Sequence, residues 1–413
     1  MEPRVIIDRA RTAAKRVAKA VYRWPLIWAA PVYRKVLLPQ TRFIGITGSA
    51  GKTTTKDLTY EILRSRFRAH KSFDTNNQLF TVARTMIEIR PGTAYCVQEV
   101  GVAGVGSMDR AVRLLAPSIA VVTTVQNEHS SAFPNDDAIA EEKAKLVRAL
   151  LPGGIAVLNA DDSRALAMAK YAPGQIVTFG LGPDADVRGA AVEADWPHGI
   201  RFEVHHRGEA HSGVAALHGT HLIYCILAAV ATGIAAGIDV PQCLAAIRDF
   251  RTPLGRMSVH TTRSGIVFVR DDWKAPLWSL AYPIEFMSNI PARRKVLILG
   301  TIADYRGSSF SRYRDIVKLA LRHVDEVVMV GPHAGKAERI ARQMPAGAVR
   351  GFPDVKSTGE YLAETLAPGD AVLLKGSHAA QHLSRLALMF DSNVRCWREQ
   401  CDKEIMCDAC ALL

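Results

Sequence analysis

The chain has 413 residues, 48% of them hydrophobic, and a formal net charge of +12. This length exceeds that of one ordinary domain, so we expect two or three domains. The composition is that of a globular protein, and no apolar run reaches the roughly 18–20 residues that span a bilayer. The first residues interleave charges with apolar side chains, unlike a secretory signal, so we expect a cytoplasmic protein.

The positive charge is concentrated in residues 1–42. This segment has many Lys and Arg residues but only two acidic residues, Glu2 and Asp8. Apolar side chains recur every three or four residues over 3–23, which predicts an amphipathic helix. A segment rich in Trp and Tyr follows at 24–33. Two interpretations stay open: this arm contacts the inner face of a membrane, or it packs on the protein with its basic face in water. We expect no nucleic-acid partner.

The apolar run 43–47 predicts a buried strand, which ends in a glycine-rich loop and continues into a helix-forming segment. In this arrangement glycines let backbone N–H groups approach an oligophosphate, and the helix N-terminus favours its negative charge. Lys52 would reach the β/γ-phosphates, and the hydroxyl of Thr53 or Thr54 would hold Mg²⁺. The sequence therefore predicts a nucleotide site. Its residues are Gly48, Ser49, Ala50, Gly51, Lys52, Thr53 and Thr54.

Apolar runs and helical patterns alternate along the rest of the chain, which predicts an α/β fold with mostly parallel sheets. In such sheets the ligand site lies at the carboxyl ends of the strands. Strands are expected at 43–47, 94–100, 119–125, 154–159, 175–179, 295–299, 326–330 and 371–374. The expected parts are a basic helical arm (1–42), a P-loop central domain (43–251), a Rossmann-like C-terminal domain (252–392) and a Cys-rich tail (393–413).

The glycine-rich loop and the motifs that follow it resemble the Mur ligases, the ATP-dependent amide-bond ligases of peptidoglycan precursor synthesis. Within that family the chain most resembles the MurF type, and the likeness runs over about 43–388. The resemblance implies that ATP converts a substrate carboxylate to an acyl phosphate, which an amine then attacks to form an amide.

Besides the loop hydroxyl, three residues are candidates for holding Mg²⁺. Glu99 closes an apolar stretch beside the predicted loop, where a carboxylate suits Mg²⁺. The resemblance assigns His129 to the second metal and Lys143 to a carbamylated, and therefore anionic, ligand. Lys145 lies two residues further on and is the alternative for that role.

Other positions follow the family pattern. The resemblance implies that Asn76 and Asn77 position substrate or phosphate, and that Arg256 reaches the ATP phosphates when the domains close. Asp271 ends a predicted strand and would contact ribose or ATP. Asp161 and Asp162 either belong to the site or only cap the next helix.

The amine would bind near a second loop, which contains Lys375 and Ser377 as in the family but has His378 where the family has arginine. We therefore expect an amine other than D-alanyl-D-alanine. Only about forty residues precede the nucleotide loop, fewer than the family's UDP-binding domain needs. We therefore also expect a different carrier for the carboxylate.

The tail contains a cysteine cluster that the resemblance does not cover. Its spacing includes one C-x₂-C pair, half of a usual zinc site, so the alternatives are bound Zn²⁺ and free thiols. For the whole chain, two other functions stay open: a nucleotide-binding regulatory protein without ligase activity, and a membrane-associated scaffold. The cysteines of the cluster are Cys396, Cys401, Cys407 and Cys410.

Overall fold

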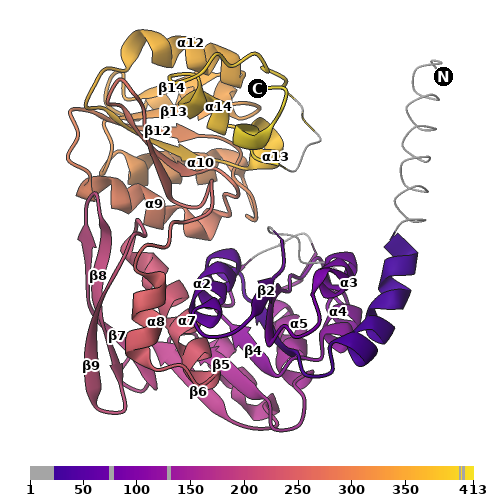
Figure 1. Cartoon of the computed structure of the whole chain (residues 1–413). Coiled ribbons are helices and arrows are strands. Elements are labelled where there is room, and N and C mark those ends of the chain that lie inside the picture. Colours follow the sequence, from indigo (N-terminus) through magenta and orange to yellow (C-terminus); the bar gives the residue numbers. More distant parts are fainter. Residues whose placement is uncertain (1–22, 74–78, 128–131, 400, 402–404) are drawn as a thin grey trace, which may run out of the picture.

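The computed structural model describes residues 23–73, 79–127, 132–399, 401 and 405–413. The described chain forms two α/β bodies, each built on its own sheet (Figure 1). The mixed α/β fold with mostly parallel sheets confirms the predicted fold class. The amphipathic helix predicted for residues 3–23 lies almost wholly outside the described residues.

The first body is built on a nine-stranded sheet among the described residues. Its strands are parallel except at one end, where β7, β8 and β9 run antiparallel. In sheet order they are β2 (Ala69–Lys71), β3 (Tyr95–Glu99), β1 (Arg42–Thr47), β4 (Ile119–Val122), β5 (Ile155–Asn159), β6 (Ile176–Gly180), β7 (Val187–Asp195), β8 (Gly199–His206) and β9 (Glu209–Ala215).

Helices cover both faces of this sheet. One face packs against α2 (Lys52–Arg64), α7 (Ile223–Ala235) and α8 (Val240–Ile247). The other face packs against α3 (Leu79–Glu88), α4 (Asp109–Leu115) and α5 (Asp136–Arg148). The short helix α6 (Ser163–Leu166) follows β5.

The central strand β1 shows why its sequence forms a buried strand. Side chains alternate between the two faces of a strand. Accordingly Ile44 and Ile46 belong to the core under α2 and α7, whereas Phe43 belongs to the core on the other face. Gly45 lies so close to α5 that a Cβ there would approach Leu146 Cδ1 to 2.6 Å. The strand therefore places the loop that follows it firmly at the edge of the sheet.

The antiparallel end of the sheet was not predicted from the sequence. Strand β8 alternates the buried Ile200, Phe202 and Val204 with more exposed polar side chains. This period of two is the usual signature of a half-buried strand, so a signal for β8 was present.

The second body is built on a six-stranded sheet among the described residues. Strand β10 is antiparallel to β11, and the other neighbours are parallel. In sheet order the strands are β10 (Ser258–Thr261), β11 (Val267–Asp271), β15 (Ala371–Lys375), β12 (Lys295–Leu299), β13 (Glu326–Val330) and β14 (Val349–Phe352). The helices are α9 (Ala281–Phe286), α10 (Ser309–Ala320), α11 (Ala337–Ala341), α12 (Val355–Thr365), α13 (His378–Gln381) and α14 (Ser384–Leu388).

A further helix precedes β1 and spans 23–37 in the part of the chain that the structure describes. In Figure 1 it lies on the side of the first body, beside α3 and α4. Within the described ranges no helix combines the length and the hydropathy needed to cross a membrane.

Candidate active site

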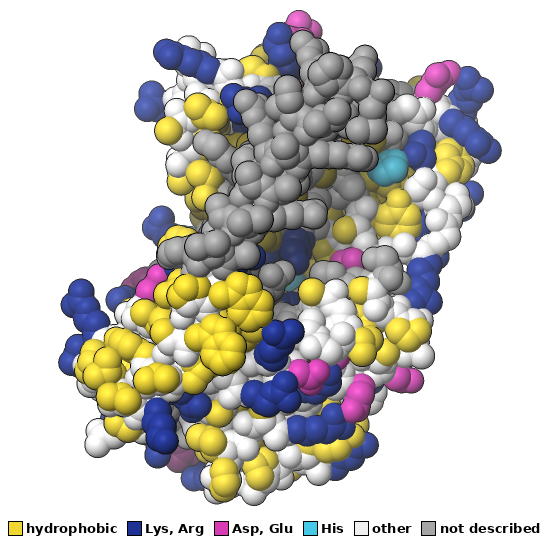
Figure 2. Space-filling model, turned by 90° about the vertical axis from the view of Figure 1, so that its right-hand side faces the viewer, with side chains coloured by type: hydrophobic (Ala, Val, Ile, Leu, Met, Phe, Trp, Pro, Cys, Tyr) yellow, Lys and Arg dark blue, Asp and Glu magenta, His cyan; other side chains and the backbone are white. Residues whose placement is uncertain are grey.

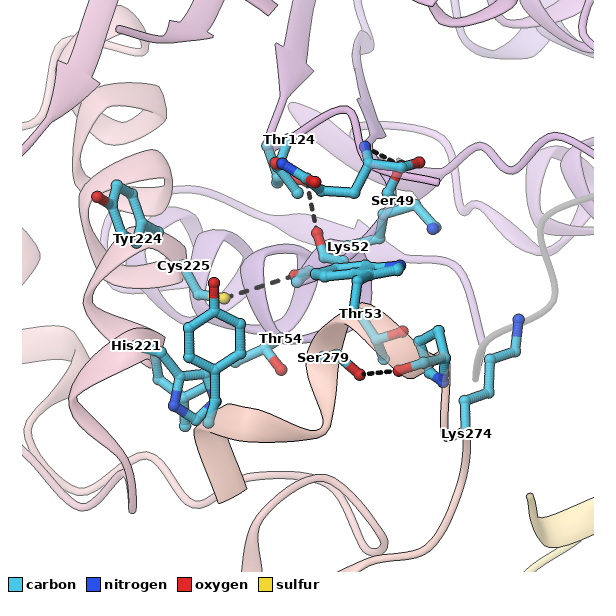
Figure 3. Close-up of a pocket in the computed structure, with 18 of the residues that line it drawn as sticks. Ser49, Lys52, Thr53, Thr54, Thr124, His221, Tyr224, Cys225, Lys274 and Ser279 are labelled. Carbon is cyan, nitrogen blue, oxygen red and sulfur yellow. Dashed lines mark hydrogen bonds between the residues drawn. The ribbon is translucent and has the colours of Figure 1, made fainter. Parts of the chain in front are cut away.

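A cavity of about 480 Å³ lies between the two bodies. One wall is the carboxyl edge of the first sheet, with the glycine-rich loop and the segments that follow β4 and β5. The other wall comes from the second body and includes Asp271, Lys274 and Lys375. In Figure 3, Lys274 and Ser279 stand on the second wall, across from Thr53. The cavity therefore lies where the sequence places the ligand site.

The glycines of the loop are required by its backbone. Gly48 has φ 148°, and a Cβ on it would come within 1.8 Å of Thr123 Oγ1. Gly51 has φ 76°, in the left-handed region, and a Cβ on it would meet Cys225 Sγ at 2.9 Å. Only glycine fits both positions without strain. The loop can thus turn directly from β1 into the N-terminus of α2.

Residues after β4 hold the loop in place. Ser49 donates its backbone N–H to the carbonyl oxygen of Thr124 over 2.7 Å, and Thr123 Oγ1 donates to the carbonyl oxygen of Ala50 over 2.6 Å. Ser49 Oγ also donates to the carbonyl oxygen of Gln126 over 2.9 Å. Thr123 and Thr124 were not predicted as site residues from the sequence. The signal was available, because both residues follow a buried strand at its carboxyl end, as Glu99 does.

The lysine of the loop folds back over it. Lys52 Nζ donates to the carbonyl oxygen of Gly48 over 2.5 Å, and the side chain lines the cavity. Figure 3 shows Lys52 beside Ser49 and Thr53. This position puts a positive charge beside the backbone N–H groups at the start of α2, as a phosphate group requires.

Two oxygen donors meet beside this lysine. Thr53 Oγ1 donates to Glu99 Oε2 over 2.7 Å, and the two residues are 7% and 2% exposed. Both line the cavity. A hydroxyl and a carboxylate oxygen are the hard donors that Mg²⁺ prefers, so the pair fits this ion.

The structure describes only some of the remaining metal and substrate candidates. His129, Asn76 and Asn77 lie outside the described residues. Lys143 is completely buried in α5, whereas Lys145 forms ion pairs of 2.8 Å with Glu142 and 3.0 Å with Asp109. Because these carboxylates hold Lys145, Lys143 is the better candidate for a modified lysine.

Two acids after β5 have different partners. Asp162 caps α6 by accepting from the backbone N–H groups of Arg164 and Ala165, and its other oxygen accepts from Thr124 Oγ1 over 2.7 Å. Asp161 instead accepts from Tyr224 Oη over 3.0 Å. Asp162 is therefore both a helix cap and a support for the cavity wall.

On the second wall, the strands β11 and β15 bring an acid and a base together. Asp271 and Lys375 are partners in the strand register, and their side chains form an ion pair. Lys375 Nζ also donates to the carbonyl oxygen of Lys274 over 2.9 Å. Arg256, which follows Gly255 between the bodies, lines the same cavity. Three residues predicted from the family pattern therefore meet the nucleotide loop across one cavity.

Aromatic residues that were not predicted from the sequence complete the cavity. Tyr282 of α9 stacks on His221 with 5.0 Å between ring centroids and 19° between ring planes. Burial lowers the pKa of His221 to about 4, so its ring is neutral at neutral pH. Trp278 also lines the cavity. No local pattern distinguishes Trp278 and Tyr282, because the packing of the two bodies brings them here.

The predicted amine loop is only partly in the cavity. Lys375 lines it, but Ser377 and His378 do not. His378 is 3% exposed, stacks on Trp273 at 5.0 Å, and pairs its Nε2 with the carbonyl oxygen of Ile405 at 3.0 Å. The structure thus places His378 under the tail, so it gives no support to a contact between His378 and the amine.

The tail folds onto the second body. Arg270 of β11 donates to both carboxylate oxygens of Asp408, over 2.6 and 2.7 Å, and Arg385 donates to the carbonyl oxygens of Cys396 and Arg398. The four tail cysteines line one small pocket with His382. Even so, no three His, Cys, Asp or Glu side chains of the described chain are arranged to hold a metal, and none of the four cysteines is in a disulfide. The zinc prediction is therefore not supported.

Comparison with known families matches this chain in two segments. Residues 46–233 match the Mur ligase middle domain, and residues 255–378 match the Mur ligase glutamate ligase domain.

Curated relatives carry the name UDP-N-acetylmuramoyl-tripeptide–D-alanyl-D-alanine ligase. The protein of Bacillus subtilis is 25% identical over 376 residues, covering 90% of this chain and 78% of the relative. The protein of Mycobacterium tuberculosis is 29% identical over 361 residues, covering 82% of this chain and 70% of the relative.

Solved structures share the fold. MurF from Acinetobacter baumannii aligns with a TM-score of 0.79 and 23% identity, over 89% of this chain and 80% of that one. MurF from Thermotoga maritima, solved in complex with ADP, aligns with a TM-score of 0.76 and 20% identity, over 89% of this chain and 82% of that one. Two matched domains, the MurF-named relatives and a glycine-rich loop facing a second domain lead to one assignment: the chain belongs to the Mur ligase family and is an ATP-dependent amide-bond ligase of the MurF type.

Proposed function

We propose that this ligase phosphorylates a substrate carboxylate with ATP in the cavity between its two bodies and passes the acyl group to an amine. One observation carries the proposal: the cavity has a phosphate-binding loop on one wall and Arg256, Asp271 and Lys375 on the other. A protein that only binds nucleotide has no need for the second wall. The MurF-named relatives likewise do not favour a regulatory protein or a scaffold without ligase activity.

The nucleotide would bind along the loop. Backbone N–H groups from Gly48 to Thr54 would hold the phosphates, and Lys52 and Arg256 would stabilise the charge that develops on the transferred phosphoryl group. Asp271 would contact the ribose or another part of ATP. Catalysis would come from these positive charges and from the positioning of the reacting groups. No nucleophilic serine or cysteine is required.

Mg²⁺ would be held by Thr53 and Glu99, with Lys143 as a carbamylated ligand and His129 at a second ion. When bound, Mg²⁺ neutralises charge on the phosphate oxygens. An unmodified lysine would repel the ion, whereas the carbamate is anionic. The carbamate would form without a cofactor, when the neutral Lys143 amine adds to CO₂ and loses a proton. Zn²⁺ has no part in the proposed reaction.

The reaction would proceed in two steps. A carboxylate oxygen attacks the γ-phosphorus of ATP, the bond from that phosphorus to the β,γ-bridging oxygen breaks, and ADP leaves. The amine nitrogen then attacks the acyl carbon, the bond to the phosphate oxygen breaks, and phosphate leaves while the nitrogen loses a proton. The products are an amide, ADP and phosphate, so no oxidant or reductant is needed.

The substrates would be a small-molecule or carrier-linked carboxylate and an amino acid, a dipeptide or another amine. Lys375 lines the cavity from the second body, so it would meet the carboxylate of an incoming amino acid or dipeptide. Asn76 and Asn77 would position the acyl substrate or phosphate. A reaction of this kind consumes ATP, so we propose a cytoplasmic location. Any membrane contact would depend on the helix 23–37 and not on this cavity.

The test measures phosphate release from ATP with panels of carboxylates and amines, including UDP-muramoyl-peptides, and the mass of the products. Phosphate release that requires both partners and yields their condensed mass is expected. With a carboxylate labelled with oxygen-18, one labelled oxygen should appear in the released phosphate. Label found in AMP instead, or turnover without a condensed product, would contradict the proposed reaction.

A further inference from the structure

The helix 23–37 is apolar on both of its long faces. Its inner face packs on the core under α3, α4 and α5, where Ala30 and Leu38 are almost completely buried and Ile27 and Tyr33 pack against them. Tyr33 Oη also donates to the carbonyl oxygen of Ile89 over 2.8 Å. A surface helix normally turns its second face to water with polar side chains. Here it does not.

The outer face carries four large apolar side chains, which we call the outer stripe. Their spacing of four residues places them in one row along the helix, about 18 Å long at 1.5 Å per residue. Figure 2 faces this side of the molecule and shows hydrophobic side chains gathered here with Lys and Arg around them. The members, with their exposed fractions, are Trp24 (49%), Trp28 (75%), Val32 (64%) and Val36 (66%).

The stripe is fixed to the body of the protein. Arg34, on the inner side, donates to the carbonyl oxygens of Leu114 and Ala116 over 3.4 and 3.0 Å and lies over the Phe43 ring. The stripe therefore needs no folding step before it can meet a partner. Single exposed apolar residues are common, but a contiguous row of this kind marks an interaction surface.

The surrounding charge indicates the partner. Arg23, Lys35 and Arg42 are exposed on or next to the helix, and the sequence has no acidic residue between Asp8 and Asp57. A second copy of this chain would bring these like charges together, which opposes self-association. An anionic bilayer surface supplies the opposite charge and an apolar layer at the depth of the stripe.

We propose that the outer stripe docks the ligase flat on an anionic membrane surface. Trp24 and Trp28 would lie at the level of the lipid headgroups, where tryptophan is favoured, and Val32 and Val36 would reach the acyl boundary. Arg23 and Lys35 would contact lipid phosphates. The proposal is independent of which substrates the cavity binds.

The test uses the full-length protein and sedimentation with vesicles of phosphatidylcholine containing about one third phosphatidylglycerol, an anionic lipid. The variant Trp28→Gln, Val32→Gln, Val36→Gln should bind at least about tenfold more weakly than the parent, because three apolar contacts are lost. Its ATP turnover should be unchanged. The matched control changes three exposed apolar residues elsewhere, and it should bind like the parent: Leu166→Gln, Ile176→Gln and Val214→Gln.

Tryptophan fluorescence gives a second measurement. Vesicles with brominated acyl chains should quench the parent protein. The double variant Trp24→Phe, Trp28→Phe keeps an apolar stripe and four of the six tryptophans, so it should still sediment but lose most of the quenching. Parent protein that does not sediment would overturn the proposal. So would equal binding of the triple-glutamine variant, or a parent dimer that this variant converts to a monomer.

Discussion

Thr53 and Glu99 come from different elements, α2 and β3, yet the Thr53 hydroxyl donates to the Glu99 carboxylate over 2.7 Å beside the nucleotide loop. The parallel pairing of β1 with β3 produces this meeting, because Ile46 lies opposite Glu99 in the strand register. The carboxyl end of β3 therefore reaches the start of α2.

Replacing Thr53 with valine should weaken the use of Mg²⁺. The valine keeps the shape but removes the hydroxyl oxygen, so the Mg²⁺ concentration for half-maximal ATP turnover should rise about tenfold or more. The measurement is phosphate release against Mg²⁺ concentration. Thr53→Ser keeps the oxygen and should stay near the parent, and equal Mg²⁺ dependence of all three proteins would rule out the role.

Lys52→Ala should abolish ATP turnover, with a loss of at least about 100-fold, because the positive charge at the phosphates is removed. Steady-state phosphate release measures the effect. Lys318→Ala is a matched control, since Lys318 is exposed on α10, and it should turn over ATP normally. Normal turnover by the Lys52 variant would refute the nucleotide site.

Lys143→Ala should be inactive and should regain part of its activity when a short-chain carboxylic acid such as acetate is added, because the acid replaces the carbamate. The same rate assay with and without acetate measures this. Lys145→Ala should remain active and should not respond to acetate, since Lys145 pairs with Glu142 and Asp109. Full activity of the Lys143 variant would exclude the modified lysine.

Asp408→Ala should destabilise the second body. It leaves the guanidinium of Arg270, whose side chain is 2% exposed, without its bidentate partner, and breaking such a pair costs about 3–5 kcal/mol. Urea unfolding gives the free energy. Adding Arg270→Met should recover part of the loss, because no unpaired charge is then buried. If Asp408→Ala alone is as stable as the parent, the ion pair between Arg270 and Asp408 does not hold the tail on the second body.

Asp272 should make stability depend on pH. Burial raises its pKa from 3.8 to about 6, so the folded state holds the proton more tightly than the unfolded state. The stability that this proton adds is complete below about pH 4 and is lost as the pH rises through about 6. The shift corresponds to roughly 3 kcal/mol.

Asp272→Asn removes this titration. As the pH rises from about 4 to about 8, the unfolding free energy of the variant minus that of the parent should therefore increase by roughly 3 kcal/mol. Urea unfolding of both proteins across that range measures the difference. If the difference between the two proteins is the same at every pH, the carboxyl group does not titrate as described.

The sequence predicted the parts of the site that depend on local pattern. The loop from Gly48 to Thr54 follows an alternating buried strand, and both its glycines are needed by local backbone geometry. Lys52, Thr53 and Glu99 therefore lie where the sequence placed them, around one cavity. The parallel sheets follow from the same alternation of strands and helices.

Positions that depend on long-range packing could not be predicted. Cys225 meets the loop through Gly51, from which it is separated by 174 residues, and Tyr282 reaches His221 only because the two bodies pack together. His378 stands at the position where the family has arginine, but the tail covers it through Ile405. A motif gives the position of a backbone turn, not what later packs over it.

The position of the cavity between the two bodies bears on ATP hydrolysis in the absence of a substrate. The glycine-rich loop belongs to the first body, whereas Asp271 and Lys375 belong to the second, and Gly255 and Arg256 lie on the link between them. Nucleotide held by the first body alone lacks the charges of the second. We therefore expect little ATP hydrolysis by the first body alone, because the charged side chains of the second wall would be missing.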